Sequence, residues 1–241
     1  MRTMHRLVRI VAVMLAIGAI VAGVYIFARA RPQDVPWTAL DLAQPIGAFT
    51  GRKITALGDE PRECRRLMTQ AGAKHAIVPP FGGDGQCLVP NGLKLEGGAR
   101  KIMFSPDSPT ITCPVAAALS VWEWEVIQPA AQRIFGQRIA AIDHLGSYNC
   151  RRIAGSEDSW SQHATANAID IAAFTLADGT RISVLADWKE GGKKAAFLRA
   201  ARDGACDLYA TVLSPDYNAA HADHFHLDQA VRGPLSWRSC R

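Results

Sequence analysis

The chain has 241 residues, of which 49% are hydrophobic and 20% are charged, and its formal net charge is +5 at pH 7. This composition is that of a globular protein and excludes global disorder. The basic residues are scattered and form no run that would line a nucleic-acid groove, so we expect no nucleic-acid partner. The length allows one domain of good size together with an anchor.

The N-terminus combines basic residues with a long apolar run. Three arginines among the first nine residues precede residues 10–28, which are uncharged, apolar and about as long as a membrane-spanning helix requires. A cleaved signal peptide has a shorter apolar core and a cleavage site between small residues, which Ala28-Arg29-Ala30 imitates. The length favours an uncleaved signal anchor over residues 1–30. We therefore predict a single-pass inner-membrane protein whose C-terminal domain lies in the periplasm.

Residues 31–61 resemble a linker, because they contain several prolines and little periodicity. We expect a tether followed by a loosely attached arm. The domain itself is expected over residues 62–241 and begins with a short helix over residues 64–72. Gly and Pro are frequent in residues 74–90, which predicts loops around one short strand, and residues 102–104 are expected to form another.

Residues 114–135 are the clearest helix. Pro114 fits a first-turn position, where a missing N–H costs nothing, and apolar residues then recur at helical spacing. Pro129 predicts a kink or a split, and Gly136 is a suitable stop. Trp122 and Trp124 are expected to pack in the core or at its rim.

Short strands follow this helix. They are expected over residues 138–144, 168–174, 181–185, 208–213 and 224–228, with one helix over residues 193–203. The second and third strands flank a turn at Gly179 and are expected to form a hairpin. The order predicts an α+β fold in which helices pack on a small, mostly antiparallel sheet.

Six cysteines occur at wide spacings, and none belongs to a CxxC motif. A zinc ribbon and a thioredoxin-like redox protein are therefore not expected. Behind an export signal, an even number of cysteines indicates disulfide bonds in an oxidising compartment. We expect the pairs Cys64–Cys87 and Cys206–Cys240, because neighbours in the sequence usually close first.

Two stretches hold four of the seven histidines: SQHATANAID, residues 161–170, and HADHFHLD, residues 221–228. Catalytic zinc takes three protein ligands and leaves a position open, and His163, Asp170 and His226 are a suitable set. Side chains alternate between the faces of a strand. In the last strand, His226 is therefore expected on an open face with His224 and Asp228, while the apolar neighbours face the core.

Four further residues are candidates for chemistry near such a zinc ion. A general base must take a proton from water, and both Asp223 and His224 are candidates for this role. His221 is a candidate to orient one of them through a hydrogen bond. Arg151 is a candidate to hold an anionic group, either a substrate carboxylate or an oxyanion.

These motifs resemble those of a known group. Ser161-x-His163-x6-Asp170 followed by His224-x-His226 resembles the zinc peptidases that join lysostaphin, the D-alanyl-D-alanine peptidases and Hedgehog domains. The stretch from His221 to His226 is similar to the second motif of penicillin-insensitive murein endopeptidases. More of the chain resembles the bacterial extensin-like C-terminal domain family, through residues 146–151, 161–170, 212–218 and 221–228.

The resemblance implies a fold like that of Hedgehog domains and D-alanyl-D-alanine peptidases. It implies zinc ligation by His163, Asp170 and His226 and a catalytic role for His224. Tyr148-x-x-Arg151 is similar to the Arg-bearing substrate stretch of those peptidases. Two positions stand out: Ala166 occupies a place where the peptidases commonly have Gly, and Asp223 occupies the place of their Glu or Asp.

Together these observations predict a periplasmic zinc-dependent hydrolase that cleaves a peptide bond in peptidoglycan, next to a D-amino acid. Endopeptidase and carboxypeptidase action remain open. The alternative is a non-catalytic module that binds the cell wall or a partner and retains a structural zinc ion. The expected partners are a peptidoglycan peptide and the inner membrane, and the sequence identifies no protein partner.

Overall fold

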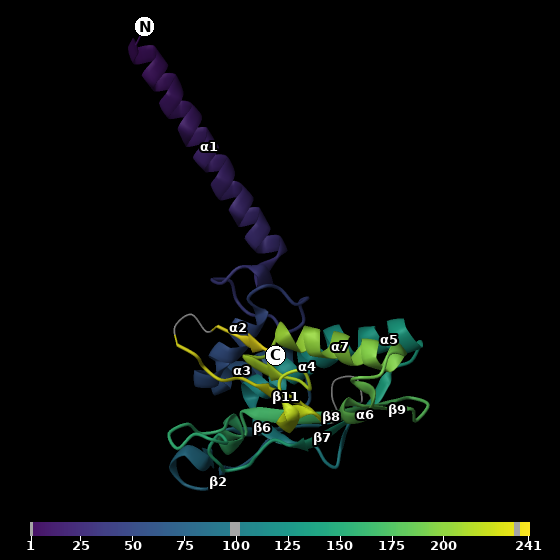
Figure 1. Cartoon of the computed structure of the whole chain (residues 1–241). Helices are drawn as coiled ribbons and strands as arrows, with labels where there is room; N and C mark the ends of the chain where they lie inside the picture. Colours follow the sequence, from purple (N-terminus) through teal and green to yellow (C-terminus); the bar gives the residue numbers. More distant parts are fainter. Residues whose placement is uncertain (1, 97–101, 234–236) are drawn as a thin grey trace.

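The computed structural model describes residues 2–96, 102–233 and 237–241. Helix α1 (Arg2–Ala30) stands away from the folded part of the chain (Figure 1), and none of its residues is buried. By length and composition, α1 is suited to span a membrane or to serve as an export signal. The apolar helix expected at the N-terminus is therefore confirmed.

Residues 31–61, which follow α1, are packed against the domain and are not a loose tether. They contain the short helix η1 (Pro32–Asp34), helix α2 (Thr50–Ala56) and the turn η2 (Leu57–Asp59). Leu42 and Ile54 are buried in the main core, and Thr55 Oγ1 donates to Gln229 Oε1 at 2.6 Å. The expectation of a loosely attached arm is wrong, because buried residues on separate short elements leave no periodic pattern.

The expected helices are present. Helix α3 (Pro61–Gln70) precedes the long helical region, which divides into α4 (Cys113–Trp122), a π-helical stretch η4 (Glu123–Ile127) and α5 (Gln128–Phe135). The π stretch lies just before Pro129, which has no N–H to give to the preceding turn. Gly136 ends α5 in the left-handed conformation, with φ +70°. Trp122 and Trp124 are buried, as expected.

The main sheet has seven strands in the order β12-β10-β11-β8-β7-β5, with β9 paired to β8. Four of its pairings are antiparallel, while β5 with β7 and β10 with β12 are parallel. The mostly antiparallel sheet, the hairpin of β8 with β9 and the α+β class are thus confirmed. The strands are β5 (Met103–Ser105), β7 (Ile139–Gly146), β8 (Ala168–Leu176), β9 (Arg181–Ser183), β10 (Thr211–Leu213), β11 (Phe225–Asp228) and β12 (Ser239–Cys240).

Two smaller sheets form beside it. One joins β1 (His75–Ile77), β4 (Gly92–Leu95) and β6 (Thr110–Thr112), and the other joins β2 (Phe81–Gly82) and β3 (Leu88–Val89). Residues 74–90 therefore contain three short strands where one was expected. Strands of two or three residues are too short to show an alternating pattern, and their partners lie elsewhere in the chain.

Helices α4, α5 and α7 (Gly192–Cys206) cover one face of the main sheet (Figure 1), and the short helix α6 (Val184–Asp187) follows β9. The sheet residues that face these helices are fully buried; they include Ile169, Ile171, Phe225 and Leu227. The residues between them, Asp170 and His226, consequently point to the opposite face of the sheet. The apolar backing of the last strand is thus confirmed.

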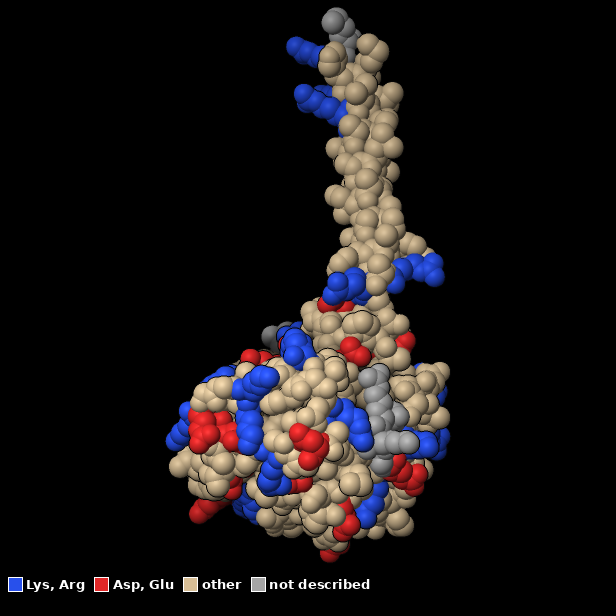
Figure 2. All heavy atoms as spheres, turned by 90° about the vertical axis from the view of Figure 1, so that its right-hand side faces the viewer, with Lys and Arg blue, Asp and Glu red and all other residues tan. Residues whose placement is uncertain are grey.

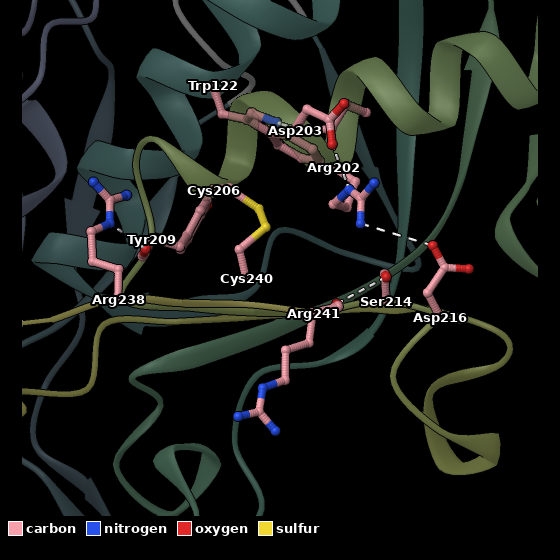
Figure 3. Close-up of a disulfide and its surroundings, with 11 residues drawn as sticks. Trp122, Arg202, Asp203, Cys206, Tyr209, Ser214, Asp216, Arg238, Cys240 and Arg241 are labelled. Atoms are coloured by element: carbon pink, nitrogen blue, oxygen red, sulfur yellow. Dashed lines mark hydrogen bonds and ion pairs between the residues drawn. A yellow bond between two sulfur atoms is a disulfide. The ribbon is translucent and has the colours of Figure 1, made fainter.

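All six cysteines form disulfide bonds, in the pairs Cys64–Cys113, Cys87–Cys150 and Cys206–Cys240. The last pair is confirmed, and Figure 3 shows it joining the end of α7 to β12. The expected pair Cys64–Cys87 is wrong. Cys64 on α3 lies next to Cys113 at the start of α4. Cys87 lies elsewhere, on the short helix η3 (Gly85–Cys87) between β2 and β3. The two cysteines that are neighbours in the sequence are therefore not neighbours in space.

Candidate metal centre

The backbone places the three predicted ligands close together. Asp170 on β8 is directly opposite His226 on β11 in the antiparallel pairing. His163 lies on the short helix η5 (Gln162–Thr165), just before β8. The Ser161 side chain accepts a hydrogen bond from His163 N and begins this helix, and Ala166 ends it with φ +54°. This left-handed conformation is one that Gly favours, so Ala166 is an unusual residue at this position.

The ligand atoms of His163, Asp170 and His226 all lie within 4.8 Å of one another. His163 Nε2 is 3.1 Å from His226 Nδ1 and 3.2 Å from Asp170 Oδ1, and His226 Nδ1 is 2.9 Å from Asp170 Oδ1. His163 is buried, and the other two side chains are half-buried. The structure therefore brings together the three residues singled out in the sequence.

Hydrogen bonds on the far side of each imidazole determine which nitrogen faces the cluster. His163 Nδ1 is 3.1 Å from the carbonyl oxygen of Ser147, and His226 Nε2 is 3.1 Å from Asp228 Oδ2. Both oxygens only accept, so these nitrogens carry the protons. When the rings are neutral, His163 Nε2 and His226 Nδ1 present lone pairs toward the carboxylate of Asp170. Three acceptors that face one another fit a bound cation, and this arrangement is typical of metal-ligating histidines.

The charges around the cluster also favour a cation. Burial of the His226 ring lowers its pKa, but hydrogen bonds to Asp170 and Asp228 outweigh burial and raise that pKa to about 9. Burial raises the pKa of Asp170, yet hydrogen bonds to His163 and His226 outweigh it and hold the pKa of that carboxyl well below its usual range. Negative carboxylates thus dominate the surroundings of the cluster, and they stabilise positive charge within it.

Two contributors were missed as functional residues in the sequence. Asp228 is 4% exposed, and besides His226 it accepts hydrogen bonds from Thr211 Oγ1 at 2.6 Å and Ala230 N at 2.9 Å. Asp228 lies two residues after His226 and therefore on the same face of the strand, and this spacing could have indicated that the two side chains interact. Ser147 contributes only a backbone carbonyl, which leaves no signal in the sequence.

The structure separates the two candidate bases. His224 Nδ1 is 2.7 Å from Asp223 Oδ1, and His224 Nε2 is 3.7 Å from Asp170 Oδ1. Because the carboxylate accepts, Nδ1 carries the proton and Nε2 turns its lone pair toward the cluster. The side chain of His224 is 12% exposed and that of Asp223 is 52% exposed. Asp223 therefore lies behind His224 as seen from the cluster.

His221 lies beside these histidines on η6 (Ala219–His221). Its ring centre is 5.2 Å from that of His224 and 6.0 Å from that of His226. Burial, helped by His224 and His226 and opposed by two carboxylates, lowers its pKa to about 4. Among the described residues, its hydrogen bond goes to Asn218 Oδ1 at 2.7 Å. His221 thus contacts the rings by packing and does not make the expected hydrogen bond to Asp223 or His224.

Arg151 lies in an exposed loop next to η5. The loop is fixed by the Cys87–Cys150 disulfide and by hydrogen bonds from Asn149 N to His163 O and from Ser161 N to Arg151 O. In the described part of the chain, the guanidinium has neither a hydrogen bond nor an ion pair, so it is available to a ligand. Tyr148 is turned to the neighbouring small sheet, where its hydroxyl donates to Cys87 O at 3.0 Å.

A cavity of about 270 Å³ lies between α2, β3, η5 and the start of α4. Thr165, Asn167 and Gln229 line it, but the three clustered ligands do not. The cluster is therefore a separate feature of the open sheet face.

These features define a disulfide-bonded α+β domain with a His–Asp–His cluster on its sheet. The family described as Extensin-like protein C-terminus matches residues 62–241, and the chain belongs to this family. Neither the curated proteins nor the solved structures contain a match to the chain.

Proposed function

We propose that the chain is a zinc-dependent hydrolase that cleaves a peptide bond of peptidoglycan next to a D-amino acid. The observation that carries the proposal is the convergence of His163 Nε2, His226 Nδ1 and Asp170, because the outward hydrogen bonds of the two rings leave these nitrogens free to act as ligands once they carry no proton. Two imidazoles and one carboxylate are a usual ligand set for catalytic zinc. A zinc ion held there supplies Lewis acidity, which polarises a carbonyl and acidifies water.

The residues around the cluster supply the rest of the chemistry. His224 Nε2 takes a proton from the attacking water and returns it to the leaving amine. Asp223 holds the His224 ring in the tautomer that this role requires, at 2.7 Å. His221 packs against the ring of His224, with the ring centres 5.2 Å apart. Arg151 binds an anionic group of the substrate.

The Asp223–His224 pair favours a hydrolase over a binding module. A module that only retains a structural ion needs neither a base near the ligands nor a carboxylate that sets its tautomer. Structural zinc sites are also usually closed by four protein ligands, whereas the described residues offer three at this cluster.

The substrate and the location rest on the sequence resemblance and on export. The three disulfides suit an oxidising compartment, and α1 suits an anchor in the inner membrane. A domain held in the periplasm meets peptidoglycan.

Metal analysis of the full chain, purified in detergent from an oxidising compartment, tests the metal site. We expect close to one zinc ion per chain, lost in His226→Ala and kept in His75→Ala. His75 is a matched control because it lies on β1, in a different sheet. A folded, oxidised chain without stoichiometric zinc, even after zinc is added back, would disprove the proposal.

Digestion of purified peptidoglycan then separates the hydrolase from the binding module. The wild-type chain is expected to release peptide fragments, identified by mass spectrometry, that show which bond is broken. Binding of intact peptidoglycan without any fragments, by a zinc-loaded chain, would favour the module.

A further inference from the structure

The segment directly after α1 is a compact, membrane-proximal collar, which we define as residues 31–49. Its ends are joined, because Phe49 N donates to Gln33 O at 2.9 Å and Ala48 N donates to Asp34 Oδ1 at 2.8 Å. Gln33 is 3% exposed, and Val35 is buried as well. Lys53 Nζ on α2 donates to Pro32 O at 2.9 Å and fixes the collar to the domain.

The collar follows α1 directly, with no flexible residues between them. Arg31 N donates to Phe27 O at 2.8 Å, so the helical hydrogen bonding runs up to the first residue of the collar. The uncharged run of residues 10–28 has a length of about 28 Å at 1.5 Å per residue, which matches a bilayer core of about 30 Å. If α1 spans the bilayer, the collar therefore lies at the level of the lipid headgroups.

One large apolar side chain of the collar faces solvent. Trp37 is 73% exposed, although Val35 and Leu42 on either side of it are buried. The arginines Arg29 and Arg31 are nearby in sequence, and Figure 2 shows basic side chains at the base of α1. Tryptophan with flanking arginines is the combination that proteins place at the membrane–water interface.

We propose that the collar docks on the lipid headgroups of the bilayer that α1 spans, with Trp37 inserted at the interface. This inference rests on the proposed membrane location but not on the zinc site. The collar then holds the domain against the membrane in a fixed orientation instead of on a flexible tether.

The orientation has a consequence for the cluster. Figure 1 shows the helical layer of α2, α4 and α7 between α1 and the main sheet. Asp170 and His226 point to the sheet face opposite these helices, because their neighbours Ile171 and Phe225 are buried against the core. A docked collar therefore turns the cluster away from the membrane.

Tryptophan quenching tests the docking. The full chain is reconstituted in phosphatidylethanolamine–phosphatidylglycerol vesicles, with and without phospholipid brominated near the glycerol end of its acyl chains. We expect bromine to quench the wild-type fluorescence and most of this quenching to disappear in Trp37→Phe. Trp160→Phe is the matched control and should keep the quenching, because Trp160 lies in the loop beside η5. Trp122, Trp124 and Trp188 are buried in the core and out of reach of lipid, and Trp237, which is 64% exposed, is replaced by Phe in every chain that is compared.

Equal quenching in Trp37→Phe and in the wild type would overturn the proposal. So would a chain recovered from the membranes with a mass that lacks α1. Neither result depends on metal or on peptidoglycan, so failure of the docking and failure of the hydrolase are distinguishable. Unchanged thermal unfolding of Trp37→Phe is expected, because this residue is 73% exposed.

Discussion

His226 lies directly opposite Asp170 in the pairing of β11 with β8, and its Nδ1 is 2.9 Å from Asp170 Oδ1. The backbone hydrogen bonds of the sheet set this register and so bring the two side chains together. A site that is organised in this way loses little conformational entropy when it binds a ligand. His163 joins them from η5, held by Ser147 on its far side.

We expect substitution of His224 to lower the cleavage rate more than substitution of Asp223. His224→Ala should lower the rate of peptidoglycan cleavage by roughly 100-fold or more, the usual contribution of a general base, while zinc content stays the same. Asp223→Asn should cost less, because the ring remains and only its preferred tautomer is lost. Fragment release measured by chromatography, with zinc measured on the same samples, checks both. A larger loss for Asp223→Asn would reverse the two roles.

Asp228 should tune the affinity for zinc. Asp228→Asn removes the charge that accepts from His226 Nε2 at 3.1 Å, and such changes typically weaken metal binding by about 10- to 100-fold. Competition with a chromophoric chelator measures this change. Asp178→Asn, at an exposed turn, is the control and should bind zinc like the wild type. Equal affinities in the two variants would rule out a supporting role for Asp228.

Zinc binding should release a proton from His226. The pKa of this imidazole is about 9 without metal, above its usual value of about 6.5, so at pH 7.5 it must lose a proton to become a ligand. Affinity for zinc should therefore rise about tenfold per pH unit up to pH 9. In the metal-free chain, the same proton stabilises the fold below about pH 6.5, and this contribution is lost as pH rises through 9.

Calorimetry in buffers of different ionisation enthalpy counts the protons released per zinc ion. We expect close to one at pH 7.5 and fewer above pH 9. A constant count across this range would show that His226 does not exchange its proton for the metal.

The Cys64–Cys113 bond should contribute strongly to stability. It closes a loop of 49 residues and connects α3 to α4, so replacing both cysteines by Ser should lower the free energy of unfolding by about 2–4 kcal/mol. Urea denaturation measures the loss. Mass spectrometry of a non-reduced digest should recover the Cys64 and Cys113 peptides linked to each other. Recovery of a Cys64–Cys87 link would contradict the observed pairing.

Gly204 marks a close approach of α7 to the π-helical stretch. A Cβ atom at this position would lie 2.6 Å from Val126 Cγ2, which is too close for any real contact. Gly204→Ala should therefore lower the free energy of unfolding by about 1–2 kcal/mol, despite the better helix propensity of Ala. Gly58→Ala has open space around it and is the control. Thermal unfolding of both variants checks this, and equal melting temperatures would contradict it.

Periodic and local features were predictable from the sequence. The long helix around Trp122, the hairpin of β8 with β9 and the alternating faces of β11 each leave a pattern in one continuous stretch. The clustering of His163 with His226 was also predictable, because both motifs adjoin apolar strands. Contacts between distant segments were not: the Cys64–Cys113 pairing depends on how α3 meets α4, which no local pattern records.

The same limit explains what the sequence left open at the site. The choice of Asp223 or His224 as the general base depends on which side chain points toward the cluster at the start of β11. The residue types alone do not decide it, because both can accept a proton. The role of Ser147 rests on a backbone carbonyl that any residue would supply. The arm before residue 62 was misjudged because its buried residues belong to short, separate elements.

The burial of Leu42 and Ile54 affects how this protein should be produced and compared. The family match begins at residue 62, but the folded unit begins earlier. A soluble fragment cut at the family boundary would lose α2, leave Gln229 without Thr55 and uncover apolar side chains that the full chain keeps from water. Such a fragment should aggregate, whereas one that starts at residue 31 keeps the whole core.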